Sequence, residues 1–259
     1  MGRVLAVANQ KGGVGKTTTV VNLAASLGEL GKKVLVVDAD AQSNATTALG
    51  IEKRKLTSTL YEVLLDQAVA SDTILRTPFG GVDLLPANVD LAGAEIELVS
   101  ASGRERRMRD MLRRVKLGYD LVLIDCPPSL GLLTLNAFVA ADSLLVPIQC
   151  EFFALEGLSQ LVGTIRRIQA GLNPGLDIGG ALLTMYDSRT NLSSQIAEEA
   201  RSFFKSRLFR TVIPRSVRLS EAPSHGVPIT VYDQRSKGAE AYLDVAREVI
   251  EREHEEGIG

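Results

Sequence analysis

The chain has few cysteines, no long apolar run and no excess of basic charge. Its 259 residues include two cysteines, Cys126 and Cys150, which stand far apart and outside any Cys-x-x-Cys pair. This usage argues against a zinc or iron–sulfur site and favours two buried thiols in a reducing compartment. No apolar run approaches the roughly 20 residues of a membrane helix, and the amino-terminus leads straight into a strand-like segment. We therefore expect a soluble, cytoplasmic protein without a leader peptide and without membrane contact.

The overall charge limits the partners that the chain can bind. Its formal net charge is −2 and its isoelectric point is about 5.8, with no basic tail at either end. A globally basic nucleic-acid binder is thereby excluded, and any contact with DNA must come from a local basic patch. With 45% hydrophobic residues the chain can bury a full core, and we expect a single domain over residues 1–259.

Short apolar runs alternate with segments of helical periodicity along most of the chain. The strand-like runs are Val4–Ala8, Val34–Val37, Val82–Leu85, Leu121–Ile124, Ser143–Ile148 and Ala181–Met185. The helical segments are Thr17–Leu30, Leu91–Leu98, Arg104–Val115, Leu130–Ala141, Leu155–Ala170, Ser193–Lys205 and Ala239–His254. This alternation predicts an α/β fold with a doubly wound, mostly parallel sheet, whose ligands bind beyond the carboxyl ends of the strands. The segment 41–56 is expected to be a mobile loop.

A glycine-rich octet between the first strand and the first helix carries the strongest functional signal. Its glycines allow backbone N–H groups to converge on a polyphosphate, Lys16 can reach the outer phosphates, and the Thr17 hydroxyl can bind a phosphate-bound Mg²⁺ ion. The pattern predicts binding of a nucleoside triphosphate, ATP, with magnesium. The predicted nucleotide-binding residues of the octet are Lys11, Gly12, Gly13, Val14, Gly15, Lys16, Thr17 and Thr18.

Lys11 makes this loop more specific, because an ordinary phosphate-binding loop needs no charge at its start. With this second lysine the sequence resembles the deviant Walker A ATPases, a P-loop family that includes the ParA/Soj partition proteins, MinD and the nitrogenase iron protein. The resemblance implies that Lys11 crosses a homodimer interface to the nucleotide of the partner subunit. Triphosphate charge that faces a lysine of a second subunit can hold two protomers together.

Two carboxylates, Asp38 and Asp40, follow the second strand at the edge of the sheet where the phosphate loop also lies. The resemblance implies that Asp40 contacts the magnesium shell and the attacking water, and that its loss blocks hydrolysis more than nucleotide binding. Asp38 is the weaker candidate, with a role in orienting the loop lysine or its neighbours. The family often has Asp-Pro-Gln-Gly-Asn here, whereas this chain has Ala41 in place of the proline and Ser43 in place of the glycine.

A third carboxylate, Asp125, ends an apolar strand in the manner of a Walker B motif. A carboxylate that caps a buried parallel strand is costly unless a cation or hydrogen bonds meet it, so Asp125 is predicted to bind magnesium through water. The predicted metal-binding set is thus Thr17, Asp40 and Asp125. The predicted catalytic set is Lys11, Lys16 and Asp40, which position and neutralise a phosphoryl group, with slow turnover in the absence of a stimulator.

Two carboxy-terminal segments, 182–191 and 213–223, are close to segments of the chromosomal ParA/Soj group. The resemblance places Pro214 and Ser216 beside the adenine base, with serine where that group commonly has asparagine. It also implies that Arg189 and Arg218, helped by Arg215, bind DNA without sequence preference. Such contacts with phosphates give affinity that depends strongly on salt.

The function implied by the resemblance is that of a partition ATPase. ATP would drive formation of a homodimer that binds double-stranded DNA on the nucleoid, and hydrolysis, stimulated by a ParB-like centromere-binding partner, would release it. The alternative is a MinD-like spatial regulator without DNA binding. That function needs a basic amphipathic tail to bind anionic lipid, whereas residues 246–256 are rich in glutamate.

Overall fold

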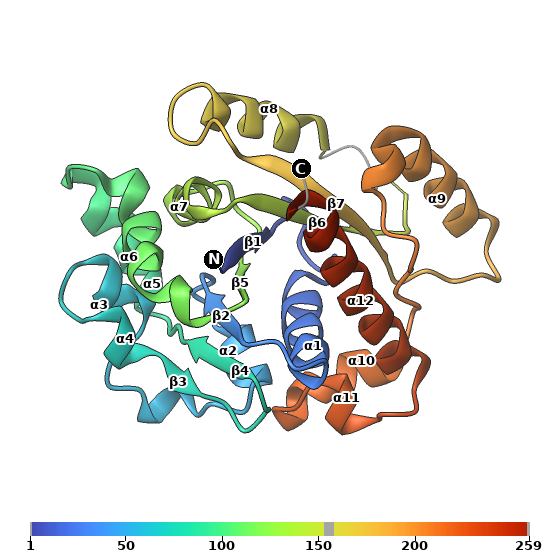
Figure 1. Cartoon of the computed structure of the whole chain (residues 1–259), viewed down its shortest axis with the longest axis horizontal. Helices are drawn as coiled ribbons and strands as arrows, with labels where there is room; N and C mark the ends of the chain where they lie inside the picture. Colours follow the sequence, from blue (N-terminus) through green and yellow to red (C-terminus); the bar gives the residue numbers. More distant parts are fainter. Residues whose placement is uncertain (1, 153–157, 258–259) are drawn as a thin grey trace.

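A seven-stranded sheet forms the centre of the computed structural model, which describes residues 2–152 and 158–257 (Figure 1). The strand order is β3-β4-β2-β5-β1-β6-β7. All neighbouring strands are parallel except β3 and β4, which pair antiparallel at one edge. The strands are β1 (Arg3–Val7), β2 (Val34–Asp38), β3 (Leu75–Arg76), β4 (Val82–Leu85), β5 (Leu121–Asp125), β6 (Ser143–Gln149) and β7 (Asp177–Thr184).

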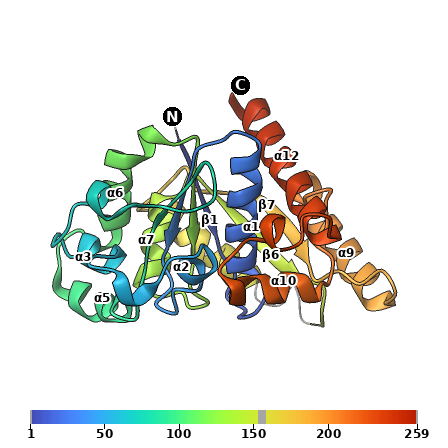
Figure 2. The same ribbon diagram turned by 90° about the horizontal axis from the view of Figure 1, so that it is seen from below.

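Helices cover both faces of this sheet and enclose two apolar clusters (Figures 1 and 2). One face carries α3 (Leu60–Leu64), α4 (Ala70–Thr73), α5 (Leu91–Glu97), α6 (Arg107–Val115), α7 (Leu132–Ala140), α8 (Leu158–Gln169) and α9 (Asn191–Phe204). The other carries α1 (Lys16–Glu29), α2 (Asn44–Ala48), α10 (Val217–Glu221), α11 (Ile229–Tyr232) and α12 (Lys237–Gly257). Short 3-10 turns are η1 (Lys53–Lys55), η2 (Leu98–Ser100), η3 (Arg104–Arg106), η4 (Lys116–Gly118), η5 (Lys205–Arg207) and η6 (Ala222–His225).

The predicted doubly wound sheet is confirmed, and all six predicted strands are present. Five of them differ from the prediction by at most one residue at either end, whereas β7 begins four residues earlier than predicted, at Asp177. The strand β3 was not predicted, because its two residues are too few to show a period of two. The short helices α2, α3, α4, α10 and α11 were not predicted either. The segment 41–56, expected to be a loop, contains α2 and η1. Residues 155–157 of one predicted helix lie outside the described residues.

The strand register brings the predicted carboxylates to one edge of the sheet. Asp38 is the register partner of Asp125 on β5, and Val7 of β1 is the partner of Asp125 on its other side. Because parallel strands end at a common edge, the loop after β1 and the carboxylates that end β2 and β5 are neighbours. The fold thereby assembles the candidate site from three segments that are far apart in the sequence.

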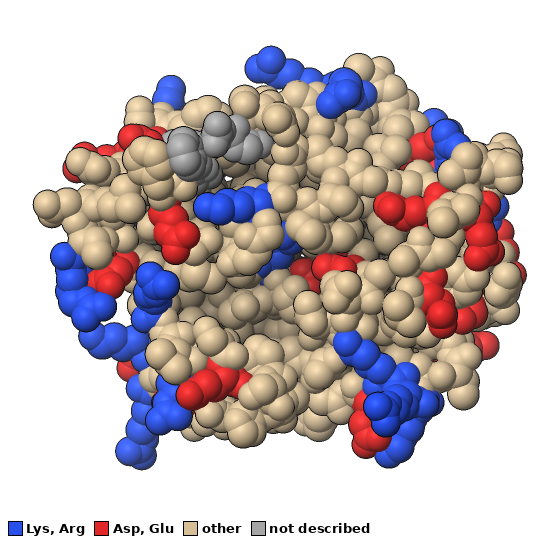
Figure 3. Space-filling model, turned by 180° about the vertical axis from the view of Figure 1, so that it is seen from behind, with Lys and Arg blue, Asp and Glu red and all other residues tan. Residues whose placement is uncertain are grey.

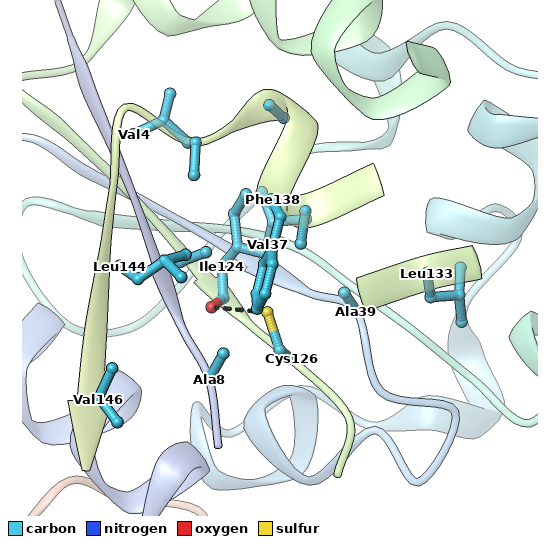
Figure 4. Packing of buried hydrophobic residues seen from close by; sticks show 14 of the residues in the cluster. Val4, Ala8, Val37, Ala39, Ile124, Cys126, Leu133, Phe138, Leu144 and Val146 are labelled. Carbon is cyan, nitrogen blue, oxygen red and sulfur yellow. Dashed lines mark hydrogen bonds between the residues drawn. The ribbon is translucent and has the colours of Figure 1, made fainter. Parts of the chain in front are cut away.

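The core beneath this edge is built from the central strands. Figure 4 shows Val4, Val37, Ile124 and Leu144 of four neighbouring strands packed together with Phe138 of α7. All five side chains are fully buried. Parallel strands buried on both faces read as continuous apolar runs, which explains why the sequence revealed them clearly.

Cys126 lies in this core immediately after β5, and its thiol donates a weak hydrogen bond to the carbonyl of Ile124 (Figure 4). Burial raises the pKa of this thiol far above its usual value and that of Cys150 to about 11. Both cysteines are free and buried, as predicted.

Two helical glycines offer a matched test of the packing. A Cβ atom on Gly28 of α1 would lie 2.3 Å from the carbonyl oxygen of Gly80, whereas one on Gly163 of α8 would meet nothing within 4 Å. We expect Gly28→Ala to lower the free energy of unfolding by about 1–3 kcal/mol through overpacking. We expect Gly163→Ala to raise it by about 0.5–1 kcal/mol through helix propensity. Urea denaturation of wild type and both variants measures the two changes in the free energy of unfolding. Equal changes in the two variants would contradict the close approach of α1 to the loop before β4.

Candidate nucleotide site

The glycine-rich loop joins β1 to α1, and its last residues lead into the first turn of the helix. Gly13 and Gly15 have φ angles of 74° and 89°, a left-handed conformation that favours glycine. Gly12 has no such constraint, and a Cβ atom there would meet nothing within 4 Å. Since the protomer itself does not require glycine at position 12, the need for a small residue there would have to come from a ligand or a partner.

Two hydrogen bonds anchor the loop to neighbouring strands. The amide of Asn9 donates to the carbonyl of Pro147 on β6 at 2.7 Å and accepts from the N–H of Lys11 at 3.0 Å. The hydroxyl of Thr184, the last residue of β7, donates to the carbonyl of Val14 at 2.9 Å. No sequence signal pointed to Asn9 or Thr184, because these contacts depend on the order of the strands in the sheet.

Lys16 is 7% exposed, and its ammonium group donates to the carbonyl of Lys11 at 3.2 Å. Burial lowers the pKa of Lys16, and the nearby carboxylates of Asp125 and Asp40 oppose this effect. Lys11 itself is exposed. The loop therefore holds one lysine inside the site and presents the other to the outside.

Asp125 is fully buried beside this loop. Its Oδ2 atom accepts a hydrogen bond of 2.7 Å from the hydroxyl of Thr17, and its Oδ1 atom has no partner among the described residues. Burial, and then the charge of Asp38, raise the pKa of Asp125 well above its ordinary value. A buried carboxylate oxygen without a partner is costly, and a cation or its bound water would satisfy it.

The donor set near Asp125 suits magnesium held together with a phosphate. Within residues 2–152 and 158–257, no three His, Cys, Asp or Glu side chains gather to form a metal cage. Mg²⁺ is commonly bound by one or two protein oxygens, several waters and substrate phosphates. The hydroxyl of Thr17 and the carboxylate of Asp125 supply this kind of incomplete shell, so the residues present fit the ion.

Asp38 is fully buried and holds the segment that follows β2. Its Oδ2 atom accepts hydrogen bonds from the N–H and the hydroxyl of Thr46 at 2.8 and 2.7 Å. The Thr46 hydroxyl oxygen in turn accepts from the N–H of Ala87 at 3.0 Å, which connects α2 to the end of β4. Its described hydrogen bonds connect Asp38 to the N–H of Asp40 and to the segment containing α2, and none of them involves a lysine of the glycine-rich loop. Burial raises the pKa of Asp38 to about 6.

Asp40 lies further out than the other two carboxylates and is partly exposed. Its side chain accepts from the N–H of Gln42 at 2.9 Å, and its carbonyl accepts from the N–H of Ser43 at 2.8 Å. Ser43 has a φ angle of 51°, a left-handed conformation in which glycine carries no strain. Glycine would adopt this backbone without strain, so Ser43 holds the turn at an energetic cost.

The predicted base segment is attached to the end of β7 at the same edge of the sheet. Tyr186 donates its N–H to the carbonyl of Ile213 and accepts from the N–H of Arg215, both at 3.0 Å. Pro214 is partly buried between these bonds, and the partly exposed Ser216 precedes α10. The structure therefore brings Pro214 and Ser216 to the edge that carries the glycine-rich loop.

The three arginines predicted to bind DNA lie on this carboxy-terminal part, and two of them are already paired. Arg189 makes a bidentate ion pair with Asp187, at 2.9 and 2.7 Å, which lowers the pKa of Asp187 to about 2. Arg218 lies 3.2 Å from Glu221 and 3.6 Å from Asp233. Arg215 is exposed and pairs with none of the described carboxylates.

The face shown in Figure 3 is hollowed at its centre, where basic and acidic atoms lie together, and further basic atoms gather along its margins. Charges of both signs are mixed over this face. Such a surface is not the broad basic plane of a protein that binds nucleic acid through a uniform positive field.

The fold and the loop together define a P-loop protein that binds nucleoside phosphates. A family model described as an AAA domain matches residues 2–178. The sporulation initiation inhibitor protein Soj of Bacillus subtilis is 57% identical over 249 residues, which cover 96% of this chain and 98% of that protein. The chromosome partitioning protein ParA of Myxococcus xanthus is 52% identical over 253 residues, which cover 98% of this chain and 89% of that protein.

Solved structures agree with this class. A Mycobacterium smegmatis protein named cobyrinic acid a,c-diamide synthase, with bound ADP and magnesium, has a TM-score of 0.85 at 43% identity, over 96% of this chain and 94% of that chain. The septum site-determining protein MinD of Pyrococcus horikoshii, complexed with Mg-ADP, has a TM-score of 0.80 at 31% identity, over 96% of each chain. The chain belongs to the ParA/Soj family of ATPases, as the sequence resemblance indicated.

The buried charge of Asp38 predicts a specific dependence of stability on pH. Because the pKa of this carboxyl rises to about 6 on folding, the folded protein binds its proton more tightly than the unfolded chain. The stabilisation is present at acid pH and is lost as the pH rises through about 6. In the absence of magnesium and nucleotide, Asp38→Asn removes this titration. We expect the stability of the variant relative to wild type to improve by about 2 kcal/mol between pH 4.5 and 7.5.

Urea denaturation at several pH values measures this change, and Asp72→Asn, at an exposed position on α4, is the control. A pH-independent difference between Asp38→Asn and wild type would show that Asp38 is ionised at no extra cost in the folded protein.

Proposed function

We propose that this chain, as a single domain over residues 1–259, is a chromosome- or plasmid-partitioning ATPase that hydrolyses ATP slowly with Mg²⁺. The observation that carries the proposal is the arrangement of the two loop lysines. Lys16 is held inside the site, whereas Lys11 is exposed at the start of the loop with no described acidic partner. An outward lysine next to the unconstrained Gly12 suits contact with the phosphates of a second protomer.

Each site residue has a task in this proposal. Lys16 leaves the carbonyl of Lys11 and binds the outer phosphates of ATP, and N–H groups of residues 12–18 surround them. Thr17 and Asp125 would hold magnesium, and the bound ion would supply charge neutralisation for phosphoryl transfer. Asp40 orients the attacking water, and Asp38 fixes the segment on which Asp40 lies. Pro214 and Ser216 contact the base.

Binding of DNA follows from dimerisation in this proposal. Arg189 and Arg218 are each compensated by carboxylates, so one protomer offers little net positive charge at this place. Two protomers joined through ATP would present two copies of Arg189, Arg215 and Arg218 to one duplex, and bivalent binding multiplies weak contacts. Hydrolysis would separate the protomers and release non-specific double-stranded DNA of the nucleoid.

The names of the relatives support this function, and a ParB-like centromere-binding protein is the proposed stimulator of hydrolysis. A MinD-like regulator without DNA binding is the alternative, because the fold of MinD is shared. One observation weighs against that alternative. The terminal helix α12 presents Asp244, Glu251 and Glu253 at least partly to solvent, and anionic lipid would repel these side chains. The described helices include none that is long and apolar enough to cross a membrane, a finding that does not separate the two functions.

Lys11→Ala is expected to leave ATP binding within about threefold of wild type and to abolish ATP-dependent dimers, because the Lys11 side chain is exposed and its ammonium group makes no described hydrogen bond within the protomer. Binding of labelled ATP and light scattering with ATP, ADP or no nucleotide measure the two effects, in an Asp40→Ala background that preserves ATP. Lys32→Ala, at a lysine outside the site, is the control.

Gly12→Val is expected to behave like Lys11→Ala, since the protomer has room for the side chain. Normal ATP-dependent dimers of Lys11→Ala would remove the main support for the proposal.

Arg189→Ala with Arg218→Ala is expected to weaken retention on long non-specific DNA while leaving ATP-dependent dimers intact. The slope of log affinity against log salt is expected to fall by about 1 for each bond to a DNA phosphate that the substitutions remove. Arg113→Ala with Arg114→Ala, two exposed arginines on α6, is the matched control. If wild-type protein forms ATP-dependent dimers that do not bind DNA, the MinD-like alternative is favoured. If the double variant still binds DNA as wild type does, the DNA-binding residues lie elsewhere.

A further inference from the structure

The segment 89–99, which consists of the turn before α5, α5 itself and the start of η2, carries apolar side chains on two sides, and one of these sides is turned to solvent. Leu91, Ala94 and Leu98 are buried in the core. A second set of apolar residues is spaced by three, four and three residues. Two of its members, Ala92 and Ile96, lie on α5 opposite the buried side chains, Val89 lies in the turn before α5, and Val99 lies in η2.

The second set is strongly exposed. Val89, Ile96 and Val99 are 74%, 77% and 59% exposed to solvent, and Ala92 is exposed as well. Single exposed apolar residues are common on protein surfaces, but several that are close together in one short segment indicate a site of interaction. We refer to Val89, Ala92, Ile96 and Val99, with the acidic residues that flank them, as the α5 face.

Acidic residues flank this set on both sides. Helical spacing places Asp90 and Glu97 on one side and Glu95 on the other. Their hydrogen-bond donors are neutral: Asn88 donates to Asp90 at 2.7 Å, the hydroxyl of Tyr61 to Glu97 at 2.7 Å, and the N–H of Leu133 to Glu95 at 3.2 Å. Across the part of the chain that the structure describes, no lysine or arginine pairs with any of the three.

This charge pattern selects the kind of partner. A second copy that docked with the same face would bring Asp90 and Glu97 against their equivalents, and like charges at an interface are costly. DNA and anionic lipid would be repelled for the same reason. An apolar stripe between two acidic margins complements a helix whose own apolar stripe has basic margins. We propose that the α5 face binds a basic amphipathic peptide segment of a partner protein.

Glu95 connects this face to the candidate nucleotide site. Its carboxylate accepts from the N–H of Leu133 in the first turn of α7, where negative charge is favoured. Residues 126–131 connect that turn to Asp125. A lysine or arginine that captured Glu95 would release the start of α7 and so change the segment beside Asp125. This effect on hydrolysis rests on the proposed function, whereas binding at the α5 face does not.

The probe is a fluorescein-labelled 15-residue peptide of leucine and lysine arranged as an amphipathic helix, and fluorescence anisotropy without nucleotide reports its binding. Ile96→Ser with Val99→Ser, and separately Asp90→Lys with Glu97→Lys, are each expected to weaken binding at least tenfold. Matched controls at other exposed positions are Val69→Ser with Val231→Ser, and Asp72→Lys with Glu240→Lys. These controls are expected to change binding less than threefold.

Equal losses in the α5 variants and their controls would mean general attraction of the peptide to an acidic protein and would overturn the proposal. Self-association of the free protein that disappears in Ile96→Ser with Val99→Ser would also overturn it, by showing that a second copy covers the face. Failure of ATP-driven dimerisation would instead affect only the proposed function, because the binding measurement contains no nucleotide.

Discussion

Two carboxylates buried side by side at the ends of β2 and β5 impose the constraint on which the site depends. Asp38 and Asp125 are register partners, and burial raises the pKa of both. Three hydrogen bonds from the following segment offset the free-energy cost of burying the Asp38 carboxylate. At Asp125 only one oxygen is satisfied, by Thr17. The remaining need for positive charge is what makes this edge of the sheet suitable for a cation bound to phosphate.

The same hydrogen bonds couple the site to its surroundings. Thr46 joins Asp38 to α2 and, through Ala87, to the end of β4. Residues 88–99 continue from that point into α5, whose Glu95 contacts the start of α7 after Asp125. The segments that follow β2, β4 and β5 are therefore mechanically connected. A ligand that neutralised Asp125 and a partner that occupied the α5 face would act on neighbouring parts of one network.

The charges near the candidate site bear on the proposed assembly of two protomers. Lys11 and Arg215 are exposed and make no described ion pair, whereas Arg189 and Arg218 are compensated by ion pairs within the protomer. An acidic protein with a few free cations gains little from one weak contact and much from two joined copies. In the proposed cycle, ATP supplies this joining because its phosphate charge is shared between protomers.

The sequence was sufficient to predict those features whose residues form a contiguous pattern. The glycine-rich octet, the apolar strands buried on both faces and the long helices were predicted, because phosphate binding by a loop and burial of a parallel strand each require a contiguous pattern. Short elements such as α2 and β3 gave no such signal, since a few residues show no period and tertiary contacts decide their conformation.

The tertiary structure alone decided the long-range contacts. These include the hydrogen bond from Thr184 to Val14 and the hydrogen bond from Thr46 to Asp38. The tertiary structure also leaves one oxygen of Asp125 without a described partner. The pairing of Arg189 with Asp187 depends on the backbone turn after β7. The sequence determined which groups this protein has for binding phosphate, whereas the order of the strands determined which of those groups are neighbours and which still lack a partner.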